Sequence, residues 1–142
     1  MTGMLSVNSN KLRLMQNTLA RVVTLTRKRD HIQLSLKKLH WLPIRQRVDF
    51  KVALFTYSIR HFGEPQHLNS LLMDYKPTRS LPSAEEHLLV VPRTKLSFTS
   101  RAFSVAAPKL WNTLPLDISN SKTMSIFRKL LKTYLYKQAY EH

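Results

Sequence analysis

The sequence predicts a mainly α fold with one small β-hairpin, in which about five helices surround a single core. Most apolar residues recur at intervals of three or four, which is the period of an amphipathic helix. Only the region between residues 88 and 105 contains short apolar runs that suit strands. The chain has 142 residues, of which 43% are hydrophobic, enough for one modest core and too few for two. We therefore expect residues 11–142 to form one domain after a flexible start at residues 1–10.

The first helix is predicted from about Lys11 to Thr26. The basic cluster Arg27-Lys28-Arg29 falls in its last turn, where cations suit the helix dipole and can also meet phosphate. Apolar residues recur on one side of this helix at three- and four-residue steps. They are Leu12, Met15, Leu19 and Val22.

Two further helices are predicted on either side of Trp41. Asp30 suits the N-cap of a short one, whose apolar residues Ile32, Leu36 and Leu39 face inward. Pro43 suits the first turn of a longer one, which runs from Ile44 to Phe62 and is closed by Gly63. Its apolar residues fill two arcs, so it is expected to be central. One arc holds Ile44, Val48, Val52, Phe55, Ile59 and Phe62, and the other holds Phe50, Leu54, Tyr57 and His61.

The next part of the chain is predicted to be less regular. Glu64-Pro65 opens a short helix with Leu68, Leu71 and Leu72 facing in. Residues 75–87 contain two prolines and no periodicity, which indicates an extended connector. Residues 88–91 and 101–105 are the strand candidates that would pair as the hairpin. Residues 106–112 form a helical turn or two that carries Trp111, before a break at Leu114-Pro115.

The C-terminal helix is predicted near residues 123–139, with Ser121 or Thr123 as its N-cap. Basic side chains surround its apolar stripe. The stripe consists of Phe127, Leu130, Leu131, Tyr134 and Leu135, and the cations are Arg128, Lys129, Lys132 and Lys137.

The charge of the chain indicates a polyanionic partner, RNA or DNA, held by electrostatics. Lys and Arg number 23 against 8 Asp and Glu, which gives a formal charge of +15, far beyond what solubility requires. A basic surface with no dedicated ligand is the simpler alternative. The candidate nucleic-acid-binding residues are Arg27, Lys28 and Arg29; Arg45, Arg47 and Lys51; and Arg93, Lys95 and Arg101.

Catalytic signatures are missing from the sequence. The chain has no cysteine, and its two glycines, Gly3 and Gly63, cannot form a phosphate-binding loop. Its histidines lack metal-ligand spacing, and its carboxylates form no Asp-Asp or Asp-x-Asp motif for a two-metal centre. We therefore predict no catalytic residue, no metal, no cofactor and no enzyme activity.

Four aromatic residues are interpreted as structural anchors, because tryptophans beside leucines and prolines usually pack in a core. They are Trp41, Trp111, Phe55 and Phe103. No apolar run approaches the ~20 residues needed to cross a bilayer, so a membrane is not an expected partner.

Several sequence blocks, in the same order over most of the chain, resemble the C-terminal region of reverse transcriptases from animal non-LTR (LINE-type) retrotransposons, after their polymerase domain. The resemblance runs from about Leu12 to Ala139. The blocks are Leu14-Met-Gln-Asn17 with Ala20-Arg21, Thr26-Arg-Lys-Arg-Asp-His31, Leu39-His-Trp-Leu-Pro-Ile-Arg-Gln-Arg47 with Asp49-Phe-Lys51, Leu89-Val-Val-Pro-Arg-Thr94, Arg101 to Pro115, and Phe127 with Leu131-Lys132-Thr133.

The resemblance implies a non-catalytic remnant of such a polymerase, because the family's endonuclease and polymerase motifs are not in this sequence. A second hypothesis is an interaction module that packs on an upstream reverse transcriptase domain, or on itself, through exposed apolar surface. A third is a mitochondrial basic protein, because no acidic residue precedes Asp30 and the start resembles a transit peptide. With no cysteine, an intracellular location is favoured, in the nucleus or cytoplasm and otherwise the mitochondrion.

Overall fold

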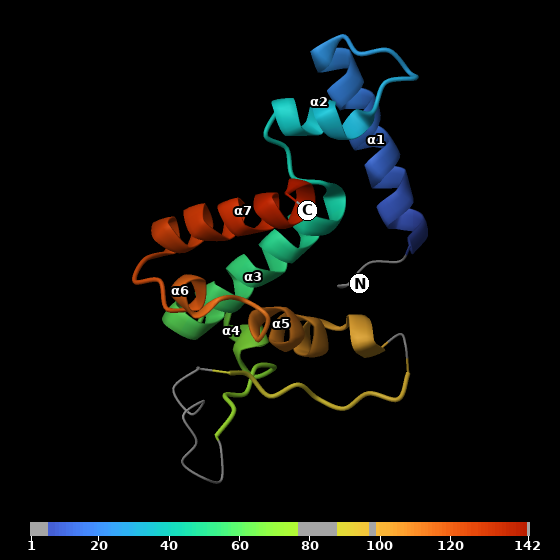
Figure 1. The fold of residues 1–142 in the computed structure, drawn as a ribbon. Helices are drawn as coiled ribbons and strands as arrows, with labels where there is room; N and C mark the ends of the chain where they lie inside the picture. The colour runs from blue at the N-terminus through green and yellow to red at the C-terminus, as the bar shows by residue number, and fades with distance from the viewer. Residues whose placement is uncertain (1–5, 77–87, 97–98, 142) are drawn as a thin grey trace.

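The structure, a computed structural model, describes residues 6–76, 88–96 and 99–141. These residues form seven α-helices and one 3-10 turn and contain no β-strand, so the prediction of a mainly α fold is confirmed. Figure 1 shows the long central helix α3 with the long helix α7 beside it, a third long helix, α1, at the edge of the molecule, and shorter helices around them. The elements are α1 (Ser6–Thr24), α2 (Ile32–Lys38), α3 (Ile44–Phe62), α4 (Gln66–Asn69), η2 (Thr99–Arg101), α5 (Phe103–Trp111), α6 (Leu116–Ser119) and α7 (Met124–Tyr140).

Helix α3 is central, as predicted, and contacts α1, α4, α5 and α7. It starts directly after Pro43 and ends at Gly63, whose φ of 70° is the left-handed conformation that closes helices and that glycine adopts without strain. Its buried residues are Ala53, Thr56, Tyr57 and Ile59. The buried side of α3 therefore lies between the two apolar arcs that the periodicity predicts, and takes one residue from each.

The core is built from α3, α5 and α7, of which α3 and α7 run antiparallel beside each other (Figure 1). Phe127 is fully buried, and its ring stacks on Tyr57 of α3 at 4.3 Å and on Trp111 of α5 at 5.9 Å between ring centroids. Leu131 and Leu135 follow at four-residue steps on the same side of α7 and are also buried. Leu130, predicted for this stripe, is exposed instead.

The predicted β-hairpin is wrong. Residues 101–105 end the 3-10 turn and begin α5, which buries Val105, Ala106, Ala107, Pro108 and Trp111. Five alternating residues cannot be distinguished from the first turn of a helix, and the apolar residues that follow them have helical spacing.

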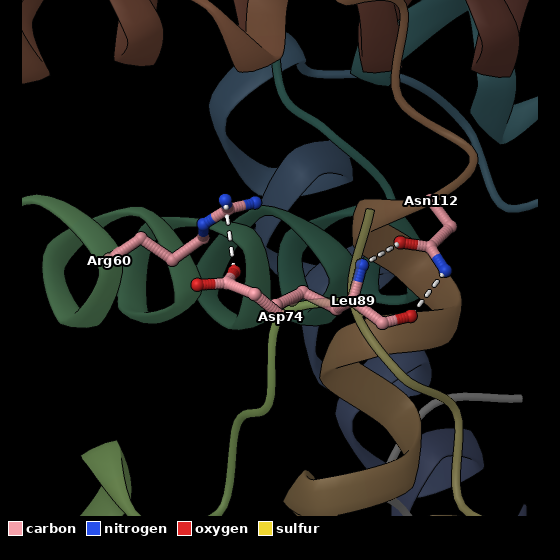
Figure 2. A network of polar contacts seen from close by, with 4 residues as sticks. All are labelled: Arg60, Asp74, Leu89 and Asn112. Atoms are coloured by element: carbon pink, nitrogen blue, oxygen red, sulfur yellow. Dashed lines mark hydrogen bonds and ion pairs between the residues drawn. The ribbon is translucent and has the colours of Figure 1, made fainter. Parts of the chain in front are cut away.

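Leu89, in the other strand candidate, makes an isolated antiparallel bridge with Asp74 instead. Asn112 holds it from the far side, because its side-chain amide donates to the Leu89 carbonyl and accepts from the Leu89 N–H, both at 2.9 Å (Figure 2). The Asp74 carboxylate lies 3.1 Å from the guanidinium of Arg60. The Asn112 side chain, at the end of α5, thus makes the backbone hydrogen bonds that a further strand would make with Leu89.

Helix α1 begins at Ser6, so residues 6–10, predicted as part of a flexible start, are helical. The side it buries is also different from the predicted apolar stripe. Gln16 and Ala20 are buried, and the Gln16 amide donates to the Leu42 carbonyl at 2.8 Å. The stripe of Leu12, Met15, Leu19 and Val22 is exposed, with 57% of Leu19 accessible to solvent. We call these four residues the α1 stripe.

The N-cap of α2 differs from the predicted one. Asp30 does not cap α2, because its carboxylate accepts the Arg27 N–H at 2.9 Å and closes the preceding turn. His31 takes the N-cap position and makes no side-chain cap. The cluster of Arg27, Lys28 and Arg29 therefore lies in this turn and not in the last turn of α1.

The C-terminal helix holds the α2–α3 connection in place. The Tyr136 hydroxyl donates to the Lys37 carbonyl at 3.1 Å, and the Tyr140 hydroxyl donates to the Trp41 carbonyl at 2.6 Å. Burial, helped by the nearby Tyr136, raises the pKa of Tyr140 to about 12. These contacts join residues 99 positions apart in the sequence.

The remaining predictions concern short segments. Thr123 caps α7 by accepting the Ile126 N–H at 3.3 Å, whereas Ser121 is buried and its hydroxyl donates to the Ile118 carbonyl. In the α4 region Leu68 and Leu72 are half-buried and Leu71 is exposed. The predicted connector lies outside the described residues from position 77 to 87.

Candidate nucleic-acid interface

A groove of about 1200 Å³ lies along the outward side of α3. We call it the α3–α7 groove. Its apolar lining comes chiefly from residues of α3 that face away from the buried side, and α1, α4, α5 and the α2–α3 connection complete it. The lining residues are Leu12, His40, Trp41, Leu42, Ile44, Arg47, Val48, Phe50, Lys51, Val52, Phe55, Leu68, Phe103, Arg128 and Lys132.

The sequence places an apolar arc in the groove because Ile44, Val48, Val52 and Phe55 are spaced by four, four and three residues. The core already receives Ala53, Thr56 and Tyr57 from another side of the helix. Phe55, interpreted as a structural anchor from the sequence, is therefore 49% exposed. Phe103, the other predicted phenylalanine anchor, is half-buried and lines the same groove.

Four cations line the groove. Arg47 and Lys51 project from α3, and Arg128 and Lys132 project from α7, each pair spaced by one helical turn. All four are exposed, and no carboxylate is among the described residues that line the groove. Like charges from two neighbouring helices add, so the groove presents a positive potential to a polyanion.

Aromatic side chains lie among the cations. Trp41 is half-buried in the groove wall, where its backbone N–H donates to the Leu36 carbonyl at 2.9 Å and its backbone carbonyl accepts the Tyr140 hydroxyl. Next to it, His40 has a left-handed φ of 53° and its ring stacks on Tyr136 at 5.8 Å. A left-handed backbone is uncommon outside glycine, and the ring contact with Tyr136 adds to the hydrogen bonds of this turn, which presents Trp41.

The structure divides the predicted cluster of Arg45, Arg47 and Lys51. Arg47 and Lys51 line the α3–α7 groove, whereas Arg45 faces another side of α3, toward α5, with Lys109. The division follows from helix geometry, because residues 45 and 47 lie about 200° apart around the axis at 100° per residue.

The other predicted cations lie elsewhere. Arg27, Lys28 and Arg29 are exposed in the α1–α2 turn, with the Asp30 carboxylate bound to the same turn. Arg93 and Lys95 are exposed in an irregular stretch, and Arg101 is half-buried in the 3-10 turn. None of these six residues lines the α3–α7 groove.

Arg128 and Lys132 were not among the residues that the sequence singled out for nucleic-acid binding. A usable signal was present, because Arg128, Lys132 and Tyr136 recur every four residues beside the buried row of Phe127, Leu131 and Leu135. The sequence could not indicate that Arg128 and Lys132 line the same groove as Arg47 and Lys51.

Trp111 plays a different part from Trp41. It is 3% exposed and packs in the core, and the Arg60 guanidinium lies 5.1 Å from its ring centroid. Beside this cluster, burial and then the charge of Arg60 lower the pKa of His61, whose ring stacks on Tyr57 at 4.0 Å. The Trp111 cluster is therefore packed against its own chain, whereas Trp41 borders open space.

Metal-ligating residues do not cluster in the described part of the chain, where no three His, Asp or Glu side chains are placed to hold an ion. Its helices also include none with the length and apolarity needed to cross a bilayer. No protein-family model matches the chain, and no curated protein or solved structure matches it at a significant level. The inference about function therefore depends on the residues themselves.

Proposed function

We propose that this chain binds single-stranded RNA or DNA in the α3–α7 groove, and that it is a non-catalytic remnant of a retroelement reverse transcriptase, as its sequence blocks suggest. The observation that carries the proposal is the meeting of Arg47 and Lys51 with Arg128 and Lys132 in one groove that also holds aromatic side chains. Non-specific binders of single strands combine the same two features.

The two kinds of side chain divide the work. The cations neutralise phosphates and release their counterions, which supplies most of a sequence-independent affinity. Trp41, Phe55 and Phe103 offer ring faces on which unpaired bases stack. Stacking needs unpaired bases, so a single strand suits the groove better than a duplex.

Fluorescence anisotropy with a labelled single-stranded 12-mer of RNA, over a series of salt concentrations, tests the proposal. We expect affinity to fall steeply with salt, and to fall when Arg47 and Lys51 are changed to glutamine together. The matched control is the double change Arg27→Gln and Arg29→Gln, which removes the same charge from the α1–α2 turn. An affinity that does not change with salt concentration, or an equal loss of affinity in both double variants, would contradict the proposal.

A second candidate function is a protein-interaction module, and a different observation favours it. The α1 stripe is exposed along its whole length, and Phe62 at the end of α3 is 61% exposed. Exposed apolar surface of this extent marks interaction sites in soluble proteins. A sedimentation series that finds only monomer, together with no binding of a hydrophobic dye, would count against this function.

A further inference from the structure

A second hollow lies between α3, α5 and α7, on a different side of α3 from the groove. Its volume is about 550 Å³, within the range of sites for small molecules. We call it the polar pocket. Its lining consists of Arg45, Gln46, Asp49, Ser100, Ala106, Lys109, Leu110, Thr113, Tyr134, Leu135 and Gln138.

Two cations from different helices line the polar pocket. Arg45 comes from the first turn of α3 and Lys109 from the last turn of α5, and both are exposed. Asp49, one turn after Arg45, is the one carboxylate among the described lining residues. A ligand that suits these two cations carries an anionic group.

Uncharged polar groups converge on the same space. The side chains of Gln46, Tyr134 and Gln138 have no hydrogen-bond partner among the described residues, although Gln46 and Tyr134 are half-buried. Each amide can both donate and accept, and the phenol can do the same. Ala106, Leu110 and Leu135 supply an apolar surface between these polar groups.

We propose that the polar pocket binds the 5′-phosphate end of a nucleotide. A phosphomonoester carries close to two negative charges at neutral pH and three acceptor oxygens, which suit Arg45 and Lys109 together. The sugar hydroxyls and base amino groups supply donors for the amides of Gln46 and Gln138. The planar base packs against the half-buried Leu110.

This site shares no lining residue with the α3–α7 groove, so it does not depend on the function proposed for the groove. The two hollows also provide controls for each other. Arg45 and Arg47 are two residues apart on one helix, and each carries a single positive charge.

Isothermal titration of the full chain with AMP, adenosine and inorganic phosphate tests the proposal. We expect AMP to bind at least about tenfold more tightly than adenosine, because a hydrogen-bonded charged group is lost in the nucleoside. The apolar contacts of the base should also make AMP bind more tightly than inorganic phosphate. The proposal would be overturned if adenosine bound as tightly as AMP, or if AMP gave no heat of binding.

Two variants locate the site. Arg45→Gln and Lys109→Gln should each weaken AMP about tenfold or more, whereas Arg47→Gln should leave AMP affinity unchanged. Thermal unfolding of each variant verifies that it is folded, and Lys109, being exposed, provides a folded variant if Arg45→Gln is not. An equal loss of AMP affinity in Arg47→Gln would mean that only net charge matters, and would refute the site.

A 5′-phosphorylated dinucleotide separates the two sources of such a ligand. Binding as tight as that of AMP would identify the end of a strand as a ligand of the polar pocket. Much weaker binding than that of AMP would identify a free nucleotide. Either result supports recognition of the 5′-phosphate, whereas binding that is unchanged when the 5′-phosphate is removed from the dinucleotide would contradict it.

Discussion

The hydroxyl of Tyr57 donates a 2.7 Å hydrogen bond to the backbone carbonyl of Ser121, across 64 residues of sequence. Tyr57 is 1% exposed, and burial raises the pKa of its phenol, so the phenol stays in the form that donates. The bond joins the middle of α3 to the segment that leads into α7. The position of the α7 row that carries Arg128 and Lys132 therefore depends on it.

Tyr57→Phe is expected to lower the free energy of unfolding by about 1–3 kcal/mol, because it leaves a buried carbonyl without its donor. Urea unfolding monitored by circular dichroism measures the change. Tyr136→Phe is the control, because it removes an exposed hydrogen bond of the same type and should cost less. Equal losses in the two variants would show that the Ser121 carbonyl finds another partner.

Asn112→Ala should release residues 88–90, because the amide makes both of the side-chain hydrogen bonds that reach the Leu89 backbone. We expect a loss of about 1–3 kcal/mol. Asn112→Asp should be nearly as harmful, since a carboxylate can accept the Leu89 N–H but repels the Leu89 carbonyl. Hydrogen exchange at the Leu89 amide is the direct measurement, and protection that stays unchanged in both variants would contradict this account.

The stability of the fold should decrease as pH falls below about 6.5, the ordinary pKa of histidine. Burial and Arg60 lower the pKa of His61 in the folded state, so the unfolded chain binds a proton more readily. The contribution of His61 is complete above its unfolded pKa and is lost as pH falls toward its folded pKa. His61→Phe keeps a ring beside Tyr57 and cannot titrate, so it should flatten the dependence between pH 5.5 and 7.5. Thermal unfolding measured across that pH range tests this prediction. If the stability of His61→Phe depends on pH as steeply as that of the unchanged protein, the pH dependence comes from another group.

Substitutions on the exposed side of α1 should change the free energy of unfolding much less than substitutions on its buried side. Leu19→Ser is expected to change stability by no more than about 0.5 kcal/mol, because Leu19 is exposed. Ala20→Leu adds three carbon atoms where no solvent reaches, and should cost about 1–3 kcal/mol through overpacking. Chemical unfolding of both variants measures the difference. A large loss in Leu19→Ser with none in Ala20→Leu would mean that α1 packs on its apolar stripe after all.

The salt dependence of nucleic-acid binding should identify the cations that touch phosphate. For single strands each contact contributes about 0.7 to the slope of log K against log salt. Arg47→Gln with Lys51→Gln should therefore reduce the slope by about 1.4.

Trp41 should add a fluorescence signal, because bases stacked on it quench its emission while buried Trp111 stays unaffected. Quenching that persists in Trp41→Phe would place the strand outside the α3–α7 groove.

Some helix ends were predictable from local residues, although the start of α1 and the N-cap of α2 were not. Helix α3 begins after Pro43 and ends before Gly63, as predicted. Thr123, which caps α7, was one of the two residues predicted for that position. The hairpin failed because five alternating residues suit a strand and a first helical turn equally well. Only the packing of Val105, Ala106 and Trp111 against the core selects the helix at that point.

The candidate site was less predictable than the fold, because it depends on which side of each helix is buried. Both arcs of α3 are apolar, so the pattern could not indicate that Ala53 and Thr56 face the core while Val52 and Phe55 face the groove. The same ambiguity hid the exposure of Leu19 on α1. Periodicity reports that a stripe exists, and only a neighbouring element determines whether it is covered.

The sequence by itself determined the net charge of +15, the absence of cysteine, the bounds of α3 and the mainly helical class of the fold, since these follow from composition and local signals. The tertiary structure alone decided that Arg47 and Lys51 face Arg128 and Lys132, and that Arg45 lies with Lys109. The physical reason is that the antiparallel packing of α3 and α7 rests on contacts between residues far apart in the chain, such as Tyr57 with Phe127. Charge could be counted from the chain, but its arrangement around two separate hollows required the packed helices.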